Sequence, residues 1–194
     1  MLSLRQPTAE QMTVFLQRQN SRGFSYDAVG ATAKSPPAGY FVSHTRVQLG
    51  SGAAAFDAAV AAIKGWQQFD LGWVGAHPAS TPIRAGEPIA VLAHLPGVWS
   101  LNPCRIVYVI DEHSAGRKFG FAYGTLPDHA ARGEERFLVE IDADENVWYD
   151  IFAFSQVRHL LAKIGLPLFR ASQKKFARGS AEAMQRVVRQ SAHK

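Results

Sequence analysis

The segment from Lys118 to Ser155 alternates in polarity as β-strands do, and it brings reactive side chains close together in the sequence. Tyr123 can donate a hydrogen bond, and Glu135 can act as a general acid or base. Arg105, one strand earlier, can bind a carboxylate or phosphate group through its planar guanidinium. Side chains of these types are suited to binding, or to transforming, a small molecule that carries a polar group.

Side-chain alternation predicts that these three residues lie on one face of a sheet. If residues 104–141 form three consecutive antiparallel strands, Arg105, Tyr123 and Glu135 point in the same direction, since every second residue of a strand faces the same side. The chain reverses at each hairpin, so all three fall at the same end of that face, which is otherwise apolar. The predicted ligand-binding residues are Arg105, Tyr123, Glu135, Phe121 and Phe137, with Phe152 approaching from the following strand.

Three interpretations of this cluster stay open. The leading one is a non-enzymatic binder of an apolar or amphiphilic small molecule, in a cavity that is apolar along its length and polar at one mouth. The second is an enzyme of the cyclase, isomerase or hydrolase type, with Glu135 as base, Tyr123 as donor and Arg105 as anion clamp. The third is a buried ion pair between Arg105 and Glu135 without any ligand. A β-bulge between Cys104 and Ile141 would break the alignment.

The elements that would position these residues can be predicted from hydrophobic periodicity and turn residues. Residues 8–11 have the form of a helix capping box, and residues 53–66 repeat apolar side chains at helical spacing. Residues 40–49 predict a first strand. Residues 71–155 have a period of two, interrupted by turns, which predicts about six antiparallel strands. The C-terminal residues then return to the helical period in one long amphipathic segment.

This order of elements predicts the helix-grip fold, an α+β fold in which a curled antiparallel sheet wraps around one long helix. A sheet of about six to seven strands and the amphipathic C-terminal helix each have an apolar face that needs a partner, so each can cover the other. We interpret residues 1–194 as a single helix-grip domain, with an N-terminal helical extension and a linker in residues 1–39.

Composition excludes several classes of protein. The chain has 194 residues, of which 47% are hydrophobic and 19% charged, as in a globular rather than a disordered protein. No apolar run is long enough to span a bilayer, and the N-terminal residues lack the apolar region of a secretory signal, so we expect a cytoplasmic protein. Cys104 is the only cysteine, which excludes an intrachain disulfide. We expect neither a metal nor a cofactor.

A glycine-rich turn at residues 50–55 imitates a dinucleotide-binding fingerprint, because it follows a strand and opens a helix, with Asp70 at the spacing of a ribose-binding acid. The preceding strand is half polar, whereas the first strand of a Rossmann fold is almost entirely apolar. An antiparallel meander follows, instead of repeated strand–helix units. We therefore interpret these glycines as a tight turn from strand to helix.

Positive charge is concentrated in the C-terminal segment. Residues 1–155 contain 12 Lys and Arg against 15 Asp and Glu, whereas residues 156–194 contain 9 against 1. A solvated helix face is the common meaning of such a segment, and contact with an anionic membrane or RNA is the alternative. The residues available for that contact are Arg158, Lys163, Arg170, Lys174, Lys175, Arg178, Arg186 and Arg189. The sequence leaves the oligomeric state open.

The sequence also contains six stretches that occur together in one family. They are GFSYDAVG at 23–30, VQLGSG at 47–52, LGW at 71–73, WSLNPCRIVYVI at 99–110, FGFAYGTLP at 119–127 and GEERF at 133–137. Together they resemble DUF1990, an uncharacterised family of bacteria and plants. The resemblance implies a helix-grip relationship to START domains, birch-pollen allergens and polyketide cyclases, in which sheet and helix enclose an apolar cavity. The family has no established activity, so the resemblance implies no catalytic role for any residue.

Overall fold

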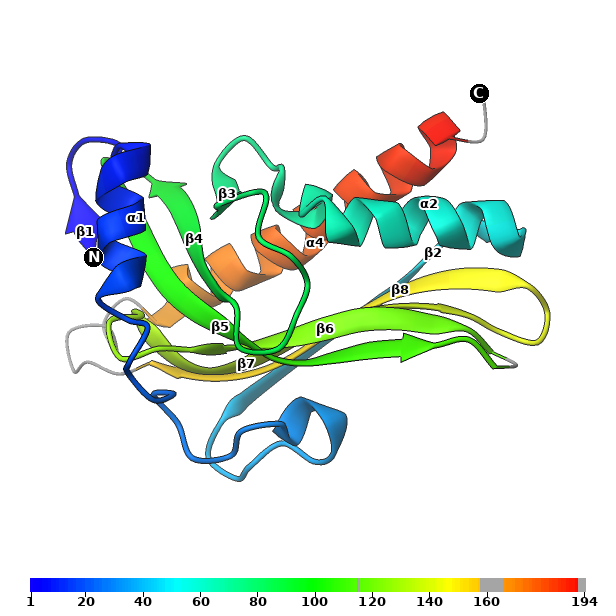
Figure 1. Ribbon diagram of the computed structural model, residues 1–194, viewed down its shortest axis with the longest axis horizontal. Helices are drawn as coiled ribbons and strands as arrows, with labels where there is room; N and C mark the ends of the chain where they lie inside the picture. The colour runs from blue at the N-terminus through cyan, green and yellow to red at the C-terminus, as the bar shows by residue number, and fades with distance from the viewer. Residues whose placement is uncertain (115, 158–165, 192–194) are drawn as a thin grey trace.

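The computed structural model describes residues 1–114, 116–157 and 166–191 (Figure 1). A curled antiparallel sheet has the strand order β2-β8-β7-β6-β5-β4-β3, and the short β1 pairs with β5. Helices α2 and α4 lie on the same face of this sheet, with α4 running across it. The strands are β1 Leu2–Ser3, β2 Phe41–Ser51, β3 Val74–His77, β4 Pro88–Leu95, β5 Val98–Glu112, β6 Lys118–Thr125, β7 Ala131–Ile141 and β8 Asn146–Val157.

The helices complete the expected order of elements. They are α1 Ala9–Gln17, α2 Gly52–Lys64 and α4 Leu166–Ser191, with two short 3₁₀ helices, η1 Ala31–Ala33 and η2 Gln67–Phe69. The predicted helix-grip fold is therefore confirmed. The interpretation of residues 1–194 as one domain stays a prediction. None of the described helices combines the length and apolar character that crossing a membrane requires.

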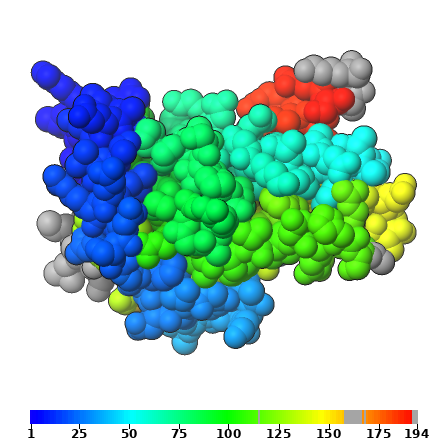
Figure 2. Space-filling model, in the orientation of Figure 1, coloured from blue at the N-terminus to red at the C-terminus, as the bar shows by residue number. Residues whose placement is uncertain are grey.

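Helix α1 begins where its capping box predicts and packs on the convex face of the sheet. The Thr8 side chain accepts a hydrogen bond from the Gln11 backbone, and the Gln11 side chain accepts one from the Thr8 backbone, so two otherwise unpaired amides are satisfied. Met12 and Leu16 form a small apolar cluster with side chains of β4 and β5, including Leu101. The blue N-terminal residues consequently cover one end of the molecule (Figure 2).

The main core fills the space between the concave face of the sheet and the helices. Its centre is an aromatic cluster in which Phe69 of η2 lies 5.4 Å from Phe137 of β7 and 5.2 Å from Phe176 of α4, measured between ring centroids. Phe121 of β6 lies 5.0 Å from Trp66 in a T-shaped arrangement. Large aromatic side chains bury much apolar area, so this cluster fixes the helices against the sheet.

Residues 23–34, here called the N-terminal segment, cover the convex face around the buried carboxylate of Glu134. The Tyr26 hydroxyl and the Gly30 amide donate to one carboxylate oxygen at 2.6 and 2.7 Å, and the Thr32 amide donates to the other at 2.9 Å. The Thr32 hydroxyl contacts the same carboxylate. A buried carboxylate needs such donors in place of water, so Glu134 holds this segment on the sheet.

Candidate functional site

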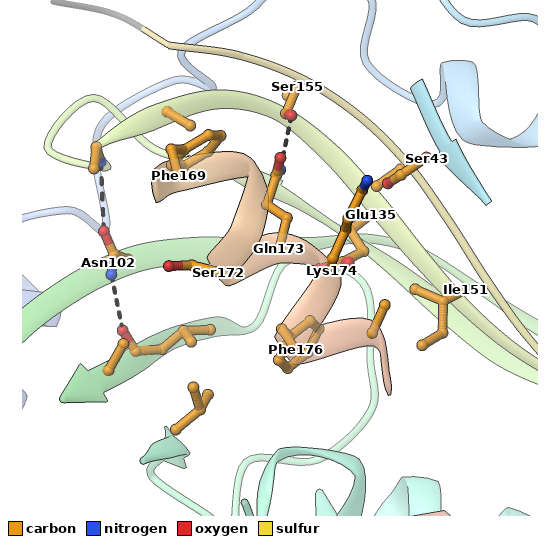
Figure 3. A pocket seen from close by; sticks show the side chains of 18 of the residues that line it. Ser43, Asn102, Glu135, Ile151, Ser155, Phe169, Ser172, Gln173, Lys174 and Phe176 are labelled. Carbon is orange, nitrogen blue, oxygen red and sulfur yellow. Dashed lines mark hydrogen bonds between the residues drawn. The ribbon is translucent and has the colours of Figure 1, made fainter. Parts of the chain in front are cut away.

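A large cavity lies beside the aromatic core, between the concave face of the sheet and the N-terminal half of α4 (Figure 3). Its volume is about 1190 Å³, which exceeds what one drug-sized ligand fills. Most of its lining is apolar and comes from several strands and from α4. Apolar residues that line it include Val91, Ala93, Ile151, Ala153, Phe169 and Phe176. An enclosure of this kind is suited to an apolar molecule.

Tyr123 and Glu135 meet in this cavity as the sequence predicts. They are direct partners in the antiparallel pairing of β6 with β7, and the Tyr123 hydroxyl donates a hydrogen bond of 2.6 Å to Glu135 Oε2. Both residues line the cavity; Tyr123 is buried and Glu135 is half-buried. Within the described part of the chain, Glu135 forms no ion pair. The pair therefore presents a carboxyl group to the cavity without a neutralising cation.

Burial changes the protonation of both groups. Loss of hydration raises the pKa of Glu135 to about 7, and the hydrogen bond from Tyr123 partly opposes this shift. Burial, together with the nearby Glu135 charge, raises the pKa of Tyr123 well above its usual value. A carboxyl group with a pKa raised toward neutrality can either accept or release a proton near neutral pH.

The pair lies toward the predicted end of the strands, and within the cavity it marks the inner limit rather than the rim. The next residues inward on the same face, Phe121 and Phe137, are fully buried in the aromatic cluster and do not line the cavity. The mouth lies at the edge of the sheet where β6 ends and β7 begins. Leu2 at this mouth is 71% exposed, and the cavity-lining Lys174 and Arg178 of α4 are exposed as well. The mouth therefore carries both apolar and basic side chains.

The placement of Arg105 on this face is wrong because β5 contains a bulge. The pairing register shifts between Ile106 and Tyr108, so Ile106 pairs with Tyr123, and Arg105 pairs with Gly124 on the convex face. The Arg105 guanidinium donates to the backbone carbonyls of Gln19, Asn20 and Arg22 at 2.8 to 2.9 Å. These carbonyls belong to the turns that follow the end of α1. Arg105 anchors α1, and it forms no ion pair with Glu135.

Phe152 also lies on the convex face, contrary to the prediction. It pairs with Arg136 of β7 and His44 of β2 and contacts both side chains there. Asp150, two residues earlier, faces the same way and accepts hydrogen bonds from His44 at 2.5 Å and Arg136 at 2.8 Å. Because β8 alternates regularly, its cavity-facing residues are instead Ile151 and Ala153.

The sequence interpretation missed several polar or small residues of the cavity. Ser43, Ala153, Glu135 and Tyr123 are successive partners across four strands, so they form one row on the concave face. Ala153 is the smallest of them and leaves room beside Glu135. Gln173 of α4 donates a hydrogen bond of 2.9 Å to Ser155 across the cavity wall (Figure 3). Strict alternation along residues 41–47 and 151–155 would have identified the strand residues.

The basic residues of the C-terminal segment have several different environments. Arg158 and Lys163 lie outside the described residues. Arg170 lies over the ring of Phe41, and Lys175 lies over the ring of Trp73. Lys174 and Arg178 line the cavity and are exposed at its margin. These positions divide the positive charge among the aromatic contacts, the cavity margin and the solvent-exposed face of α4. No group of three or more candidate metal ligands occurs among the described residues.

Comparison with solved structures places the chain in the helix-grip fold. The Zhui aromatase/cyclase from Streptomyces sp. R1128 superimposes with a TM-score of 0.54 at 8% identity, over 77% of this chain and 94% of that one. Human STARD10 superimposes with a TM-score of 0.50 at 10% identity, over 95% of this chain and 80% of that one. At such low identities the likeness concerns the fold alone.

Comparison of amino-acid sequences finds relatives of much higher identity than the solved structures. A UPF0548 protein of Arabidopsis thaliana is 31% identical, with 96% of this chain and 97% of that protein covered. A UPF0548 protein of Deinococcus radiodurans is 36% identical, with 97% of this chain and 99% of that protein covered. The family model described as "Domain of unknown function (DUF1990)" matches residues 25–183, which include most of the N-terminal segment, the whole sheet from β2 to β8 and most of α4. The chain therefore belongs to the DUF1990 family.

Proposed function

We propose that the protein binds an apolar or amphiphilic small molecule in the cavity between the sheet and α4. One observation carries this proposal: a cavity of about 1190 Å³ with a largely apolar lining contains the Tyr123–Glu135 pair at its inner limit. Such an arrangement combines apolar area for affinity with a few polar atoms for orientation. Tyr123, Glu135 and Ala153 are the residues that we assign to direct ligand contact.

The proposal is tested by removing part of the cavity without touching the polar pair. Ala153→Leu adds three carbon atoms beside Glu135, where Ala153 lines the cavity. Ala54→Leu, on the exposed side of α2, is the matched control because it makes the same change outside the cavity. Both variants are titrated with N-phenyl-1-naphthylamine, a neutral apolar fluorophore. Organic extracts of the denatured proteins are examined by mass spectrometry.

We expect wild type and Ala54→Leu to bind the fluorophore equally, and Ala153→Leu to bind at least tenfold more weakly, since overpacking typically costs about 1–3 kcal/mol. Any compound that copurifies with wild type should be depleted from the Ala153→Leu extract. Equal binding by Ala153→Leu and wild type would show that the fluorophore binds elsewhere. An absence of binding in all three proteins would contradict the proposal.

An enzyme is the second candidate, and the protonation of Glu135 is the observation that favours it. A cavity carboxyl with a pKa of about 7 is well suited to exchange protons near neutral pH. With a ketone bound, a C–H bond next to the carbonyl would break, its proton would move to the Glu135 carboxylate, and the electron pair would become an enolate. Tyr123 could then donate to the enolate oxygen.

This second candidate is tested by isotope exchange. 2-Tetralone in deuterium oxide is incubated with the protein, and loss of its α-proton signal is followed by NMR. We expect wild type to exceed Glu135→Gln in exchange rate by at least a hundredfold, since a general base contributes about 10²–10⁴. An exchange rate that Glu135→Gln leaves unchanged would exclude Glu135 as the base. Binding of the fluorophore by both proteins would leave the binding proposal standing.

A further inference from the structure

The position of Glu135 restricts the chemical class of the ligand. One of its oxygens accepts the hydrogen bond from Tyr123, and the other has no hydrogen-bond partner among the described residues. Since Glu135 lines the cavity, this second oxygen is available to a ligand. An acceptor that faces an apolar cavity without a partner favours a ligand that brings a donor.

Charge around Glu135 argues against an anionic ligand group at this position. The guanidinium of Arg105 lies on the other face of the sheet, where backbone carbonyls occupy it. Lys174 and Arg178 line the cavity from α4, but neither forms an ion pair with Glu135. When Glu135 is ionised, as at pH 8, a carboxylate or phosphate placed beside it would bring two like charges together where water is scarce, and this is strongly unfavourable.

The shape of the cavity determines the orientation in which a ligand binds. Phe121 and Phe137 close it beyond the Tyr123–Glu135 pair, whereas its mouth carries the exposed side chain of Leu2 and the exposed basic side chains of α4. A molecule that reaches Glu135 therefore enters with its polar group first and leaves its apolar part toward the mouth. This order is opposite to that of a lipid whose charged head group stays in water.

We propose that the ligand is an alcohol, phenol or amine whose donor group enters first and binds Glu135, and that Glu135 discriminates against carboxylates and phosphates. This inference rests on the proposed function and goes beyond it by naming the ligand class. Glu135 is the specificity-determining residue. Tyr123 is a positioning residue for this discrimination, because its hydroxyl holds one carboxylate oxygen and leaves the other directed to the ligand.

The test compares three probes with the same alkyl chain: decan-1-ol, decylamine and decanoate. Each displaces N-phenyl-1-naphthylamine at pH 8 from wild type, from Glu135→Gln and from Glu140→Gln. Glu140 is the matched control, since it lies on the same strand and on the opposite face, where it pairs with Arg46. Thermal unfolding of each variant establishes that it is folded.

We expect decan-1-ol and decylamine to bind wild type and Glu140→Gln at least tenfold more tightly than decanoate. In Glu135→Gln the difference between decan-1-ol and decanoate should shrink to less than threefold, because the like charge is gone. If Glu135→Gln does not fold, the order of the affinities of the three probes for wild type tests the proposed ligand class.

Failure of this inference differs from failure of the proposed function. Equal affinities for all three probes, or tighter binding of decanoate, would overturn the ligand class while leaving a cavity that binds apolar molecules. A preference that persists unchanged in Glu135→Gln would overturn the role of Glu135. If neither the fluorophore nor any probe binds wild type, the proposed function is overturned and this inference with it.

Discussion

At the scale of single residues, Glu135 links the stability of the fold to pH. Burial raises its pKa to about 7 in the folded protein, whereas the carboxyl returns to about 4.5 in the unfolded chain. Between these values the folded state holds a proton that the unfolded chain has released. The free energy of unfolding should therefore fall as the pH rises from about 4.5 to about 7, by up to about 3 kcal/mol, and stay constant above that.

The Glu135→Gln variant should lose this dependence. Glutamine keeps an acceptor for the Tyr123 hydroxyl but carries no charge, so the variant should be more stable than wild type at pH 8 and similar to it at pH 4.5. Urea unfolding at pH 4.5, 6, 7 and 8 measures the difference. Glu112→Gln, at an exposed carboxyl of β5, is the control and should retain the wild-type slope. The same slope in Glu135→Gln would contradict the raised pKa.

Arg105 provides a second prediction, because its three hydrogen bonds hold the carbonyls that follow α1. Arg105→Ala should lower the free energy of unfolding by about 1–3 kcal/mol, since these acceptors lose a charged donor. Arg84→Ala removes an exposed ion pair with Glu87 and should cost less than about 1 kcal/mol. Both variants should bind N-phenyl-1-naphthylamine as wild type does. If Arg105→Ala bound the fluorophore more weakly and Arg84→Ala did not, Arg105 would have to be counted among the ligand-binding residues.

Single residues also separate what could be predicted from what could not. Tyr123 and Glu135 were placed correctly because β6 and β7 pair without interruption, so alternation transmits the face from one strand to the next. Arg105 was misplaced because one extra residue in β5 reverses every side chain before it. The prediction for Phe152 was wrong because the register in which β8 pairs with β7 decides which face of the sheet Phe152 occupies. That register cannot be read from the short distance between the two strands in the sequence.

At the scale of elements, alternation along β7 explains how two neighbouring glutamates acquire different roles. Glu134 faces the convex side and holds the N-terminal segment, while Glu135 faces the cavity. The two carboxyls thus lie on opposite faces of one strand, one beneath the N-terminal segment and the other in the cavity. The motif GEERF therefore combines a structural residue with a candidate ligand-binding residue, which composition alone does not distinguish.

The contact between the N-terminal segment and the sheet leads to a prediction at Gly124. A Cβ atom at this position would lie 2.1 Å from the Tyr26 hydroxyl, so Gly124→Ala must displace Tyr26 from Glu134. We expect a loss of about 1–3 kcal/mol in the free energy of unfolding. Gly75→Ala, in β3, has open space around the new Cβ and should be neutral or stabilising by up to about 1 kcal/mol.

Hydrogen exchange locates the effect of Gly124→Ala. The amides of Gly30 and Thr32 donate to Glu134, so their exchange should accelerate in the Gly124→Ala variant and stay unchanged in Gly75→Ala. A variant that is destabilised uniformly, without faster exchange at these amides, would mean that Tyr26 adjusts without releasing the N-terminal segment.

At the scale of the whole molecule, the layer between sheet and helices is filled at one end and open at the other. The filled end contains the aromatic cluster, where α2, η2 and Phe176 of α4 pack against the sheet. Among the residues of α4 whose burial the structure describes, the buried ones lie beyond position 179; they are Ser180, Ala181, Ala183, Met184 and Val188. One long helix thus serves two purposes, since its C-terminal half is mainly packed into the core and its N-terminal half forms most of the helical wall of the cavity.

This division predicts a gradient of protection along α4. Residues 169–179 pack only partly against the sheet, so their amides should exchange faster than those of residues 180–190, where Met184 is fully buried. A ligand in the cavity adds contacts to Phe169 and Phe176 and none to Met184. Saturation with N-phenyl-1-naphthylamine should therefore slow exchange in residues 169–179 by at least threefold and have a smaller effect on residues 180–190, which contribute Ala181, Glu182 and Gln185 to the lining.

Exchange followed by mass spectrometry, with and without the fluorophore, measures both halves in one experiment. The Ala153→Leu variant is the control, because its added side chain occupies ligand space. In this variant the fluorophore should no longer slow exchange in residues 169–179. Equal protection of both halves from hydrogen exchange in the free protein would mean that α4 packs equally tightly against the sheet along its whole length. A ligand effect confined to residues 180–190 would move the binding site to the filled end.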